Sequence, residues 1–239
     1  MTRLYVEAPL AEGARLDLPA DAAHHAVQVL RLGAGATLTL FDGRGGEYQA
    51  RIESADRRSV VVGVGAHSEV ERESALDLTL AQCVSKGDRM DYTIQKAVEL
   101  GVTRIVPLLS ARSVVRLDAE RWRKKLEHWR GVVRAACEQC GRNLLPELAP
   151  VVPLMDWLSH SAGVRLVLVP DAEQALGGIE PAGAATLLVG PEGGLESSEI
   201  EAAQRRGCTA VRLGPRVLRT ETAGVALLAA LQVLWGDLR

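Results

Sequence analysis

The pattern of hydrophobic and polar positions changes near residue 72. Before that point, short β-branched and apolar stretches predict strands, and the glycine-rich residues 42–46 predict a turn between two of them. Residues 21–30 have helical spacing, with Asp21 as the expected N-cap. Short strands, glycine turns and one small helix are typical of a small β-barrel, here over residues 1–72. The predicted strands are residues 4–7, 37–41, 47–52 and 59–64.

After a polar linker at residues 66–76, predicted strands alternate with predicted helices. This succession indicates an α/β domain over residues 73–239, with a mostly parallel sheet flanked by helices. The last helix is apolar on nearly every side, so we expect it to be buried inside the domain or against another subunit. The predicted strands are residues 78–84, 105–109, 164–169, 186–189 and 210–213. The predicted helices are residues 89–100, 118–142, 199–206 and 221–235.

The composition is that of a globular protein, with 239 residues of which 47% are hydrophobic and 24% charged, and it excludes a chain that is disordered throughout. A net charge of −2 argues against a simple polycationic nucleic-acid binder but says nothing about local patches. Of the 28 basic residues, 24 are Arg, whose forked guanidinium suits RNA phosphates. GC-rich codon usage or heat adaptation explains this excess better.

Several functional classes lack their motifs. Residues 1–10 contain no continuous apolar segment for secretion, and the longest apolar run, residues 223–235, is shorter than the ~20 residues that span a bilayer. The pair Cys137 and Cys140 lies in a predicted helix, and no second pair or His cluster completes a metal site. Residues 43–46 precede a strand rather than a helix, so they do not form a phosphate loop. We therefore expect a soluble, reduced, cytoplasmic protein without a metal.

The most informative stretch is residues 186–222. An apolar strand runs directly into the loop at residues 190–194, GPEGG, and Ser198 with Glu201 fits the capping box of the helix that follows. A glycine loop between a strand end and a helix lies where open α/β sheets bind ligands. Its three glycines allow the backbone to approach a flat ligand closely.

A second unit of the same kind follows at once. The strand at residues 210–213 leads into Gly214 and Pro215, so two loops in succession are expected to line one cleft. Ordinary strand-to-helix turns would explain the glycines. They would not explain four polar residues, residues 219–222, in front of an apolar helix, where charge is costly unless it is paired or functional.

These loops carry a resemblance to a known family. GPEGGLESSE and RLGPRVLRTETA are similar to the C-terminal motifs of the SPOUT class of RNA methyltransferases. Nearly the whole chain resembles the bacterial 16S ribosomal RNA uridine-N3 methyltransferases, the RsmE family. That resemblance includes HHAVQVLRLGAGATLTLFDGRGGEY, KGDRMDYTIQKAVELGVTRIVPLLSARSVVR and ACEQCGRNLLP. Pro215 is a small departure from the family's pattern, at a position where we do not expect a fixed residue.

The resemblance implies a PUA-like RNA-binding β-barrel over residues 1–72 and a SPOUT methyltransferase domain over residues 73–239. It also implies a deep trefoil knot at about residues 165–235, and a homodimer with the active site at the subunit interface. The implied cofactor is S-adenosylmethionine, bound in a bent shape within the knot. Its implied contacts are Leu168, Val169, Pro170, Val189, Gly190, Pro191, Glu192, Gly193, Gly194, Leu213, Gly214, Val217, Leu218 and Thr222.

The implied reaction requires that a uridine N3 lose its proton and face an electrophilic methyl carbon. Arg219 could stabilise the negative charge that develops on a uracil oxygen. We favour this role because an unpaired cation at the mouth of a buried helix is costly. Glu221 could accept the proton or orient Arg219, and pairing with the helix dipole is an equally good explanation of this residue.

The implied substrate is 16S rRNA, within the 30S subunit, and it requires local positive charge. Residues 112–142 contain nine basic and four acidic residues, a local net charge of +5. Trp122 and Trp129 lie seven residues apart on the predicted helix, so they share a face that could stack on a base or, more simply, pack in the core. The candidate RNA contacts are His25, Arg31, Lys86, Arg89, Arg112, Arg116, Lys124, Lys125, Arg134 and Arg142.

Three other functions remain open at this point. A SPOUT enzyme with another RNA target would share the fold and the cofactor, although the N-terminal barrel and the KGDRM segment argue against it. A non-catalytic ribosome-assembly factor would bind rRNA but not S-adenosylmethionine. A nicotinamide-dependent oxidoreductase is the most distant alternative, because no G-x-G-x-x-G sequence opens a helix.

Overall fold

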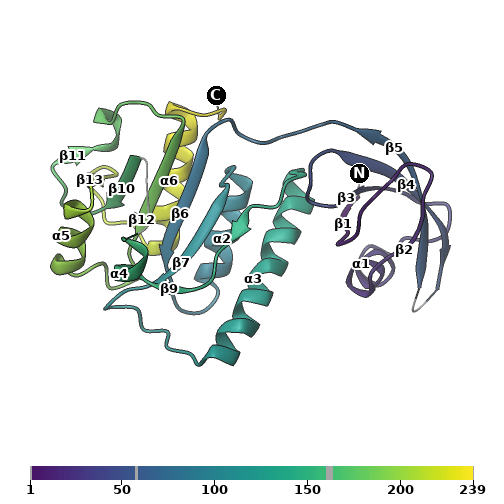
Figure 1. Cartoon of the computed structure of the whole chain (residues 1–239), viewed down its shortest axis with the longest axis horizontal. Coiled ribbons are helices and arrows are strands. Elements are labelled where there is room, and N and C mark those ends of the chain that lie inside the picture. The colour runs from purple at the N-terminus through teal and green to yellow at the C-terminus, as the bar shows by residue number, and fades with distance from the viewer. Residues whose placement is uncertain (1, 57–58, 160–163, 239) are drawn as a thin grey trace. The chain divides into compact units, whose positions relative to one another are not determined.

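The chain, described here from a computed structural model, forms two compact units (Figure 1). The structure describes residues 2–56, 59–159 and 164–238. The first unit is Met1–Glu73 together with Cys137–Leu145, and the second is Ser74–Ala136 together with Pro146–Arg239. The return of residues 137–145 to the first unit is not visible in the hydrophobic pattern, which predicts them as the end of a helix and a loop of the second domain.

The first unit is built on a five-stranded sheet in the order β1-β3-β4-β5-β2. Most neighbours are antiparallel, but β1 and β3 are parallel. The described strands form an open path with β1 and β2 at its edges, so the closed barrel predicted above is not what the pairing gives. Alternating side chains such as Leu38, Leu40, Ile52 and Val62 form its core. The strands are β1 (Arg3–Tyr5), β2 (Arg15–Asp17), β3 (Thr37–Phe41), β4 (Glu47–Ala55) and β5 (Val60–Ser68).

The short helical segment of this unit differs from its prediction. The α-helix α1 (Ala20–His24) begins after Pro19, which occupies the N-cap, and Asp21 lies in the first turn instead. A proline supplies a helix-compatible φ but no side-chain acceptor, so the first turn has no side-chain cap. A π-helix, η1 (His25–Val29), continues the segment. Arg31 then follows with φ 55°, the only positive φ among the described non-glycine residues.

The second unit contains an eight-stranded sheet in which every described pair of strands is parallel, as predicted. Its order is β11-β13-β10-β12-β6-β7-β8, and β9 also pairs with β7. The strands are β6 (Asp77–Cys83), β7 (Arg104–Leu109), β8 (Glu147–Leu148), β9 (Val152–Pro153), β10 (Val164–Leu168), β11 (Gln174–Ala175), β12 (Ala184–Val189) and β13 (Cys208–Arg212). The three two-residue strands, β8, β9 and β11, have no clear pattern in the sequence.

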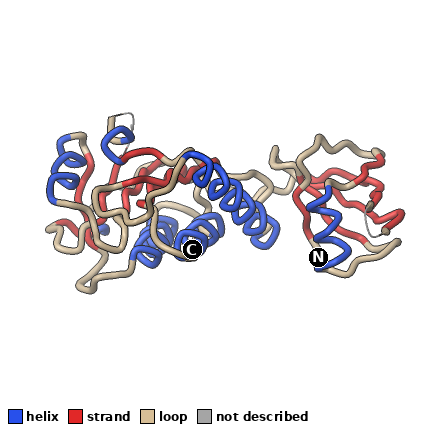
Figure 2. The backbone as a smooth tube through the Cα atoms, turned by 90° about the horizontal axis from the view of Figure 1, so that it is seen from below, coloured by secondary structure: helices blue, strands red, loops and turns tan. Residues whose placement is uncertain are grey.

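Helices flank this sheet on both sides (Figure 2). Such cover explains why central strands like β12 are apolar along most of their length. In Figure 1, α2 and α6 lie side by side, and α6 also contacts β6 and β12. The helices are α2 (Arg89–Glu99), α3 (Ala119–Cys140), α4 (Leu154–Trp157), α5 (Ser197–Arg205) and α6 (Thr220–Leu234), with a 3-10 turn, η2 (Leu176–Gly178).

The last helix, α6, is buried on one side and exposed on another. Leu227, Leu228 and Leu231 have no exposed surface, whereas Val233 and Leu234 near its end are about half exposed. Gln232, the polar residue within the apolar run, is buried and satisfied, because its amide donates to the Leu100 carbonyl at 2.9 Å. Within the described residues, none of the helices combines the length and the apolar character that a membrane crossing requires.

Candidate active site

A cavity of about 500 Å³ opens at one edge of the second sheet. It is lined by the loops that follow β10, β12 and β13, and by the start of α6. These three strands are neighbours and parallel, so their carboxyl ends meet at the same edge of the sheet. The prediction that the two glycine loops line one cleft is therefore confirmed, and the loop after β10 joins them.

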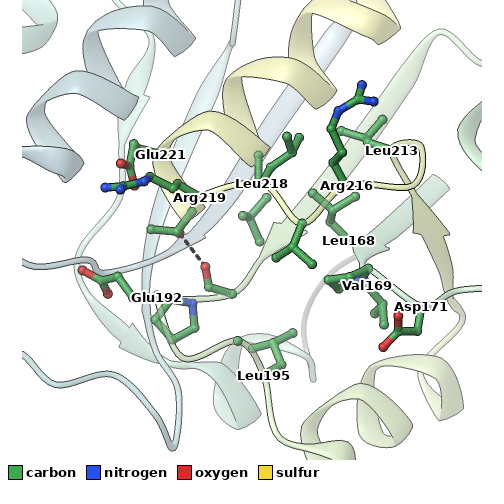
Figure 3. Close-up of a pocket in the computed structure, with 18 of the residues that line it drawn as sticks. Leu168, Val169, Asp171, Glu192, Leu195, Leu213, Arg216, Leu218, Arg219 and Glu221 are labelled. Carbon is green, nitrogen blue, oxygen red and sulfur yellow. Dashed lines mark hydrogen bonds between the residues drawn. The ribbon is translucent and has the colours of Figure 1, made fainter.

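The cavity has an apolar centre between two charged sides (Figure 3). Leucine and valine side chains from all three loops occupy the centre. Asp171 and Arg216 lie toward one side, and Glu192, Arg219 and Glu221 gather at the other. An apolar slot with a few polar groups at its ends is typical of a small-molecule site. The labelled apolar residues are Leu168, Val169, Leu195, Leu213 and Leu218.

Buried hydrogen bonds fix the first glycine of the GPEGG loop. The Thr220 hydroxyl, at the start of α6, donates to the Gly190 carbonyl at 2.6 Å, shown as the dashed line in Figure 3. Gln82 on β6 donates in turn to the Thr220 oxygen at 2.9 Å. A Cβ on Gly190 would lie 3.1 Å from the Leu195 backbone nitrogen, so the tight turn requires glycine there. The loop is thus attached to β6 and α6 from behind the cavity.

The far end of the GPEGG loop is held by a capping box that differs from the predicted one. Glu196 is the N-cap of α5, and Glu199, rather than Glu201, is its partner; the Glu199 carboxylate accepts the Glu196 N–H at 2.9 Å. Glu199 is buried, and its other oxygen accepts a hydrogen bond from the Ala111 N–H at 2.8 Å. Glu201 lies on the exposed side of α5 and cannot form this hydrogen bond. Sequence spacing alone fits both pairs of residues.

Two carboxylates and two guanidinium groups gather at one side of the cavity. Arg89, the first residue of α2, lies 2.7 Å from Glu192 and 3.7 Å from Glu221. Glu192 also accepts the Lys86 N–H at 2.8 Å. Burial favours the neutral form of Glu192, but hydrogen bonds from the backbone and from Arg89 outweigh it and lower the pKa of this carboxyl below its usual value. Glu192 therefore carries its negative charge at neutral pH.

Arg219 and Glu221 differ in their surroundings. Arg219 is exposed, so the desolvation cost used above to favour its role does not apply. Among the described residues, no hydrogen bond or ion pair holds its guanidinium, which is therefore available to a ligand. Glu221 is only 17% exposed, and one carboxylate oxygen, Oε2, is buried without a hydrogen-bond partner in the described structure. A buried unpaired acceptor beside a cavity is costly unless a ligand completes it.

Most of the expected cofactor contacts line this cavity. Gly193 and Thr222 do not: the Gly193 carbonyl accepts a hydrogen bond from Arg112, and Thr222 points to solvent on the first turn of α6. Sequence reasoning missed other lining residues, whose only signal is a place just after a strand end or in the first turn of a helix. The missed residues are Asp171, Leu195, Ile200 and Ala223, whereas Thr220 belongs to the four polar residues singled out before the last helix and Arg216 lies in the predicted second loop.

The expected RNA contacts of the second unit are dispersed. Lys86, Arg112, Arg116 and Lys124 are exposed, and Lys124 is 2.8 Å from Glu120 on the same helix. Arg89 and Arg134 are half-buried. Lys125 also belongs to a packing contact, because it lies 3.6 Å from Asp91 of α2.

The two tryptophans of α3 share a face, with ring centroids 6.4 Å apart. Trp129 is fully buried and donates to Asp91 at 2.9 Å, so it packs in the core and cannot stack on a base. Trp122 is half-buried. Of the two explanations given above for this pair, packing holds for Trp129.

The first unit contains His25, Arg31 and Arg142. Arg31 is exposed, and His25 lies 3.7 Å from Glu138. Arg142 is only 3% exposed, and its guanidinium binds the Glu73 carboxylate at 2.5 and 3.1 Å. A buried, paired guanidinium holds the fold of this unit and is not accessible to phosphate, so the assignment of Arg142 as an RNA contact is corrected. No local sequence signal separates it from the exposed arginines nearby.

Both parts of the chain match models of known protein families. The family model described as "RNA methyltransferase domain" matches residues 72–232, and "RNA methyltransferase PUA domain" matches residues 18–64. Among curated proteins, the ribosomal RNA small subunit methyltransferase E of Buchnera aphidicola (subsp. Schizaphis graminum) is 32% identical over 99% of this chain and 97% of its own length. The protein of the same name from Bacillus subtilis is 30% identical over 99% of this chain and 100% of its own.

The structure is also similar to solved structures. A ribosomal RNA small subunit methyltransferase E from Neisseria gonorrhoeae, bound to S-adenosylmethionine, is 40% identical over the whole of both chains, with a TM-score of 0.93. A methyltransferase from Legionella pneumophila, in complex with the same cofactor, is 39% identical over 99% of this chain and 98% of its own, with a TM-score of 0.97. The chain therefore belongs to the RNA methyltransferase family, among the proteins named ribosomal RNA small subunit methyltransferase E.

Proposed function

We propose that this protein transfers the methyl group of S-adenosylmethionine to N3 of a uridine in 16S rRNA. The observation that carries the proposal is the placement of Arg219 and Glu221 beside an apolar cavity formed by the ends of three neighbouring parallel strands. The cofactor and the small-subunit rRNA substrate are those named for its relatives. This cofactor and this substrate favour the proposal over a ribosome-assembly factor and over an oxidoreductase.

The residues present fit S-adenosylmethionine. A cavity of about 500 Å³ suits a ligand of this size. Leu168, Leu213 and Leu218 offer an apolar slot for a purine, and the loop backbone around Gly190 and Gly194 offers hydrogen-bonding groups without side-chain obstruction. Carboxylates near both sides of the slot, Asp171 on one and Glu192 on the other, suit the hydroxyl groups and cationic groups of such a cofactor.

When bound, S-adenosylmethionine supplies a methyl carbon made electrophilic by its sulfonium. The residues of this chain then act on the uridine. The Glu221 Oε2 atom, which no described residue satisfies, accepts the proton that leaves N3. The Arg219 guanidinium donates to a uracil oxygen, on which negative charge develops as the proton leaves. The roles follow from charge: a carboxylate can take the proton, and a guanidinium can only donate.

The same pair of groups favours uracil over cytosine. Uracil presents an N3–H donor between two carbonyl acceptors, which matches a carboxylate acceptor next to a guanidinium donor. Cytosine presents an unprotonated N3, so a carboxylate placed at N3 would face a lone pair and would lose its hydrogen-bond donor. An unpaired buried acceptor costs about 1–3 kcal/mol, or a discrimination of roughly 5- to 150-fold from Glu221 alone.

We propose that exposed basic residues of each unit contact the RNA. These residues are Arg112, Arg116 and Lys124 on the second unit, and Arg31 on the first. Lys86 and Arg134 belong to the same expectation, with His25 as a further candidate. The local charge of residues 112–142 explains how a protein with a net charge of −2 attracts phosphate.

We also propose the knot, the homodimer and the cellular context implied by the family. The order β13-β10-β12-β6, in which the chain returns between strands laid down earlier, supports a knot at about residues 165–235. The exposed side chains of Tyr92 on α2 and of Val233 and Leu234 on α6 support a homodimer, because these helices pack together. An rRNA substrate within the 30S subunit supports a cytoplasmic location.

The test is methyl transfer from labelled S-adenosylmethionine to small ribosomal subunits, and to protein-free 16S rRNA, from a strain that lacks the modification. Nucleoside analysis should identify 3-methyluridine as the product, and the better acceptor shows whether assembly precedes methylation. Glu221→Gln should lower kcat by about 10²–10⁴-fold, the usual contribution of a general base. Cofactor binding without transfer to either acceptor would redirect the search to other RNAs. No cofactor binding at all would support an assembly factor.

A further inference from the structure

The side chain of Arg89 connects three segments that are far apart in the sequence. Its Nη1 atom lies 2.7 Å from Oε1 of Glu192, in the GPEGG loop, and its Nε atom lies 3.7 Å from Oε1 of Glu221, on α6. Arg89 itself is the first residue of α2. One guanidinium therefore bridges a cofactor loop and the proposed general base. Both carboxylates also line the cavity.

At the GPEGG end of this bridge, Glu192 accepts two hydrogen bonds. The Glu192 oxygen that binds Arg89 also accepts the Lys86 N–H at 2.8 Å, so two donors from the β6–α2 connection hold one carboxylate oxygen. Charge-assisted hydrogen bonds of this kind are about twice as strong as neutral ones. Arg89 is 40% exposed and Glu192 29%, so the bridge lies at the rim of the cavity rather than in the core.

The Glu221 end of the bridge engages only one of two carboxylate oxygens. Oε1 faces the Arg89 Nε atom, while Oε2 is buried without a partner in the described structure. An ion pair at Oε1 restricts where Oε2 lies, and proton transfer to a base requires such a restricted position. A forked guanidinium can hold two carboxylates at once, whereas an ammonium group of Lys has no such geometry.

We infer that Arg89 is a positioning residue, which ties the cofactor loop to Glu221 and so aligns the proposed base with the methyl group, rather than an RNA contact. The inference rests on the proposed function. This role replaces the assignment of Arg89 to the RNA surface. Two carboxylates already neutralise the positive charge of its guanidinium, so its attraction for a phosphate is weak.

The two roles of Arg89 predict different kinetics. For a positioning residue, Arg89→Met should lower kcat by about 10- to 100-fold, the effect of a small misplacement of reacting groups. The KM for RNA and the salt dependence of RNA binding should not change. A phosphate contact predicts the reverse: an unchanged kcat, weaker RNA binding, and a salt slope smaller by about 0.7–0.9. Arg89→Lys should recover only part of kcat, because the donors of an ammonium share one nitrogen, whereas Arg89 reaches the two carboxylates from two separate nitrogens.

A double-mutant cycle provides a readout that needs no methyl transfer. Arg89→Met and Glu192→Gln should each weaken S-adenosylmethionine binding, measured by calorimetry, and the fold-loss of the double variant should be smaller than the product of the two single losses. Lys96→Met is the matched control, because it removes another cation from the same helix, α2, where Lys96 pairs only with Glu99 among the described carboxylates. It should keep the wild-type kcat and cofactor affinity.

The outcomes separate this inference from the proposed function. A wild-type protein that neither binds the cofactor nor methylates rRNA overturns the proposed function and the positioning role together. An active wild type with an Arg89→Met variant that keeps its kcat overturns the positioning role alone. Multiplicative effects of Arg89→Met and Glu192→Gln on cofactor affinity would likewise show that the bridge does not act as a unit. Non-additive affinities together with a kcat loss at unchanged RNA KM support the inference.

Discussion

At the residue scale, the site combines the Arg219 guanidinium, which no described residue pairs with, and the Glu221 carboxylate, which pairs with Arg89 through one oxygen. Arg219 is the N-cap of α6 and is exposed, while Glu221 lies two residues further in the first turn and is mostly buried. A carboxylate in the first turn is stabilised by the amide groups of the helix N-terminus. The guanidinium of Arg219 has no such support and is free to follow the substrate. Substitutions at the two positions should therefore differ in kind.

Arg219→Ala should reduce methyl transfer by at least about 10²–10³-fold, the cost of removing one donor to a developing oxyanion. Cofactor affinity should remain within a few-fold of wild type because no residue in the described part of the chain forms a hydrogen bond or ion pair with the Arg219 guanidinium. Single-turnover transfer and calorimetric binding measure the two quantities, with Arg205→Ala as a matched control, because Arg205 is 68% exposed on α5 and is not among the residues that line the cavity. Equal losses of transfer and cofactor affinity would assign Arg219 to cofactor binding instead.

At the element scale, two side-chain hydrogen bonds connect the start of α6 to the strands β6 and β12. Gln82 on β6 donates to Thr220, and Thr220 donates to the Gly190 carbonyl at the end of β12. Both side chains are buried, at 0% and 6% exposure, so neither hydrogen bond can be replaced by bulk water. These two hydrogen bonds fix the position of Gly190 relative to Glu221, the proposed base on α6.

Thr220→Val preserves the shape of the side chain but leaves the Gly190 carbonyl and the Gln82 amide without this partner. The free energy of unfolding should fall by about 1–3 kcal/mol, and cofactor affinity should weaken with it. Thr220→Ser retains the hydroxyl and should retain most of both. Urea denaturation and calorimetric binding of the two variants provide the comparison. Valine and serine variants with equal cofactor affinity would contradict a role for the hydroxyl.

A second contact between elements joins α2 to α3 through Asp91. Its carboxylate accepts hydrogen bonds from Trp129 at 2.9 Å and His128 at 2.5 Å, and Lys125 lies 3.6 Å away. Burial favours the neutral acid, but these hydrogen bonds and the charge of Lys125 outweigh it and lower the pKa of Asp91 below its usual value of 3.8. The ionised carboxylate therefore contributes stability to the folded state.

The pH dependence of Asp91→Asn follows from that direction. Because the folded pKa is depressed, the stabilisation is present above the unfolded value of 3.8 and is lost as pH falls through the lower, folded value. Asp91→Asn should lower the free energy of unfolding by about 1–2 kcal/mol at neutral pH, with a smaller difference from wild type below pH 3.8. Urea denaturation across this range measures it. A difference that is independent of pH would show that the carboxylate charge is not involved.

The predictability of these elements depends on how local their causes are. The strand β3 (Thr37–Phe41) and the start of α2 (Arg89–Glu99) agree with the sequence pattern, because alternation and helical spacing are properties of neighbouring residues. The two-residue strands β8 and β9 exist only through pairing with β7, which no local pattern reveals. The capping box was assigned to the wrong glutamate because Glu199 is chosen by a distant backbone N–H, that of Ala111.

The site was predictable to a similar extent. Glycines at strand ends located the loops, and the resemblance to a family supplied the cofactor. The partners of individual side chains depend on three-dimensional proximity. Nothing in the sequence separates buried Arg142, paired with Glu73, from exposed Arg116, and nothing connects Arg89 with Glu192, more than a hundred residues later.

At the scale of the whole molecule, charge is concentrated where RNA is expected to bind. The overall charge is −2, whereas residues 112–142 carry nine basic and four acidic residues. The structure removes Arg142 from this set and shows that Lys125 also contacts Asp91. Arg116 and Lys124 remain as exposed cations whose replacement leaves the core intact. These two residues are therefore suitable probes of RNA binding.

Charge reversal at these two positions, Arg116→Glu with Lys124→Glu, should weaken rRNA binding and flatten its salt dependence. Each lost phosphate contact lowers the slope of log K against log salt by about 0.7–0.9, so the loss is largest at low salt and shrinks as salt is added. Filter binding of 16S rRNA over a salt series measures the slope. Arg205→Glu with Arg206→Glu is the matched control, because both arginines are exposed at the end of α5 and the pair carries the same change of charge outside the proposed surface. If this control weakens binding as much as Arg116→Glu with Lys124→Glu, the effect is one of net charge, and the basic surface on residues 112–134 is not the RNA site.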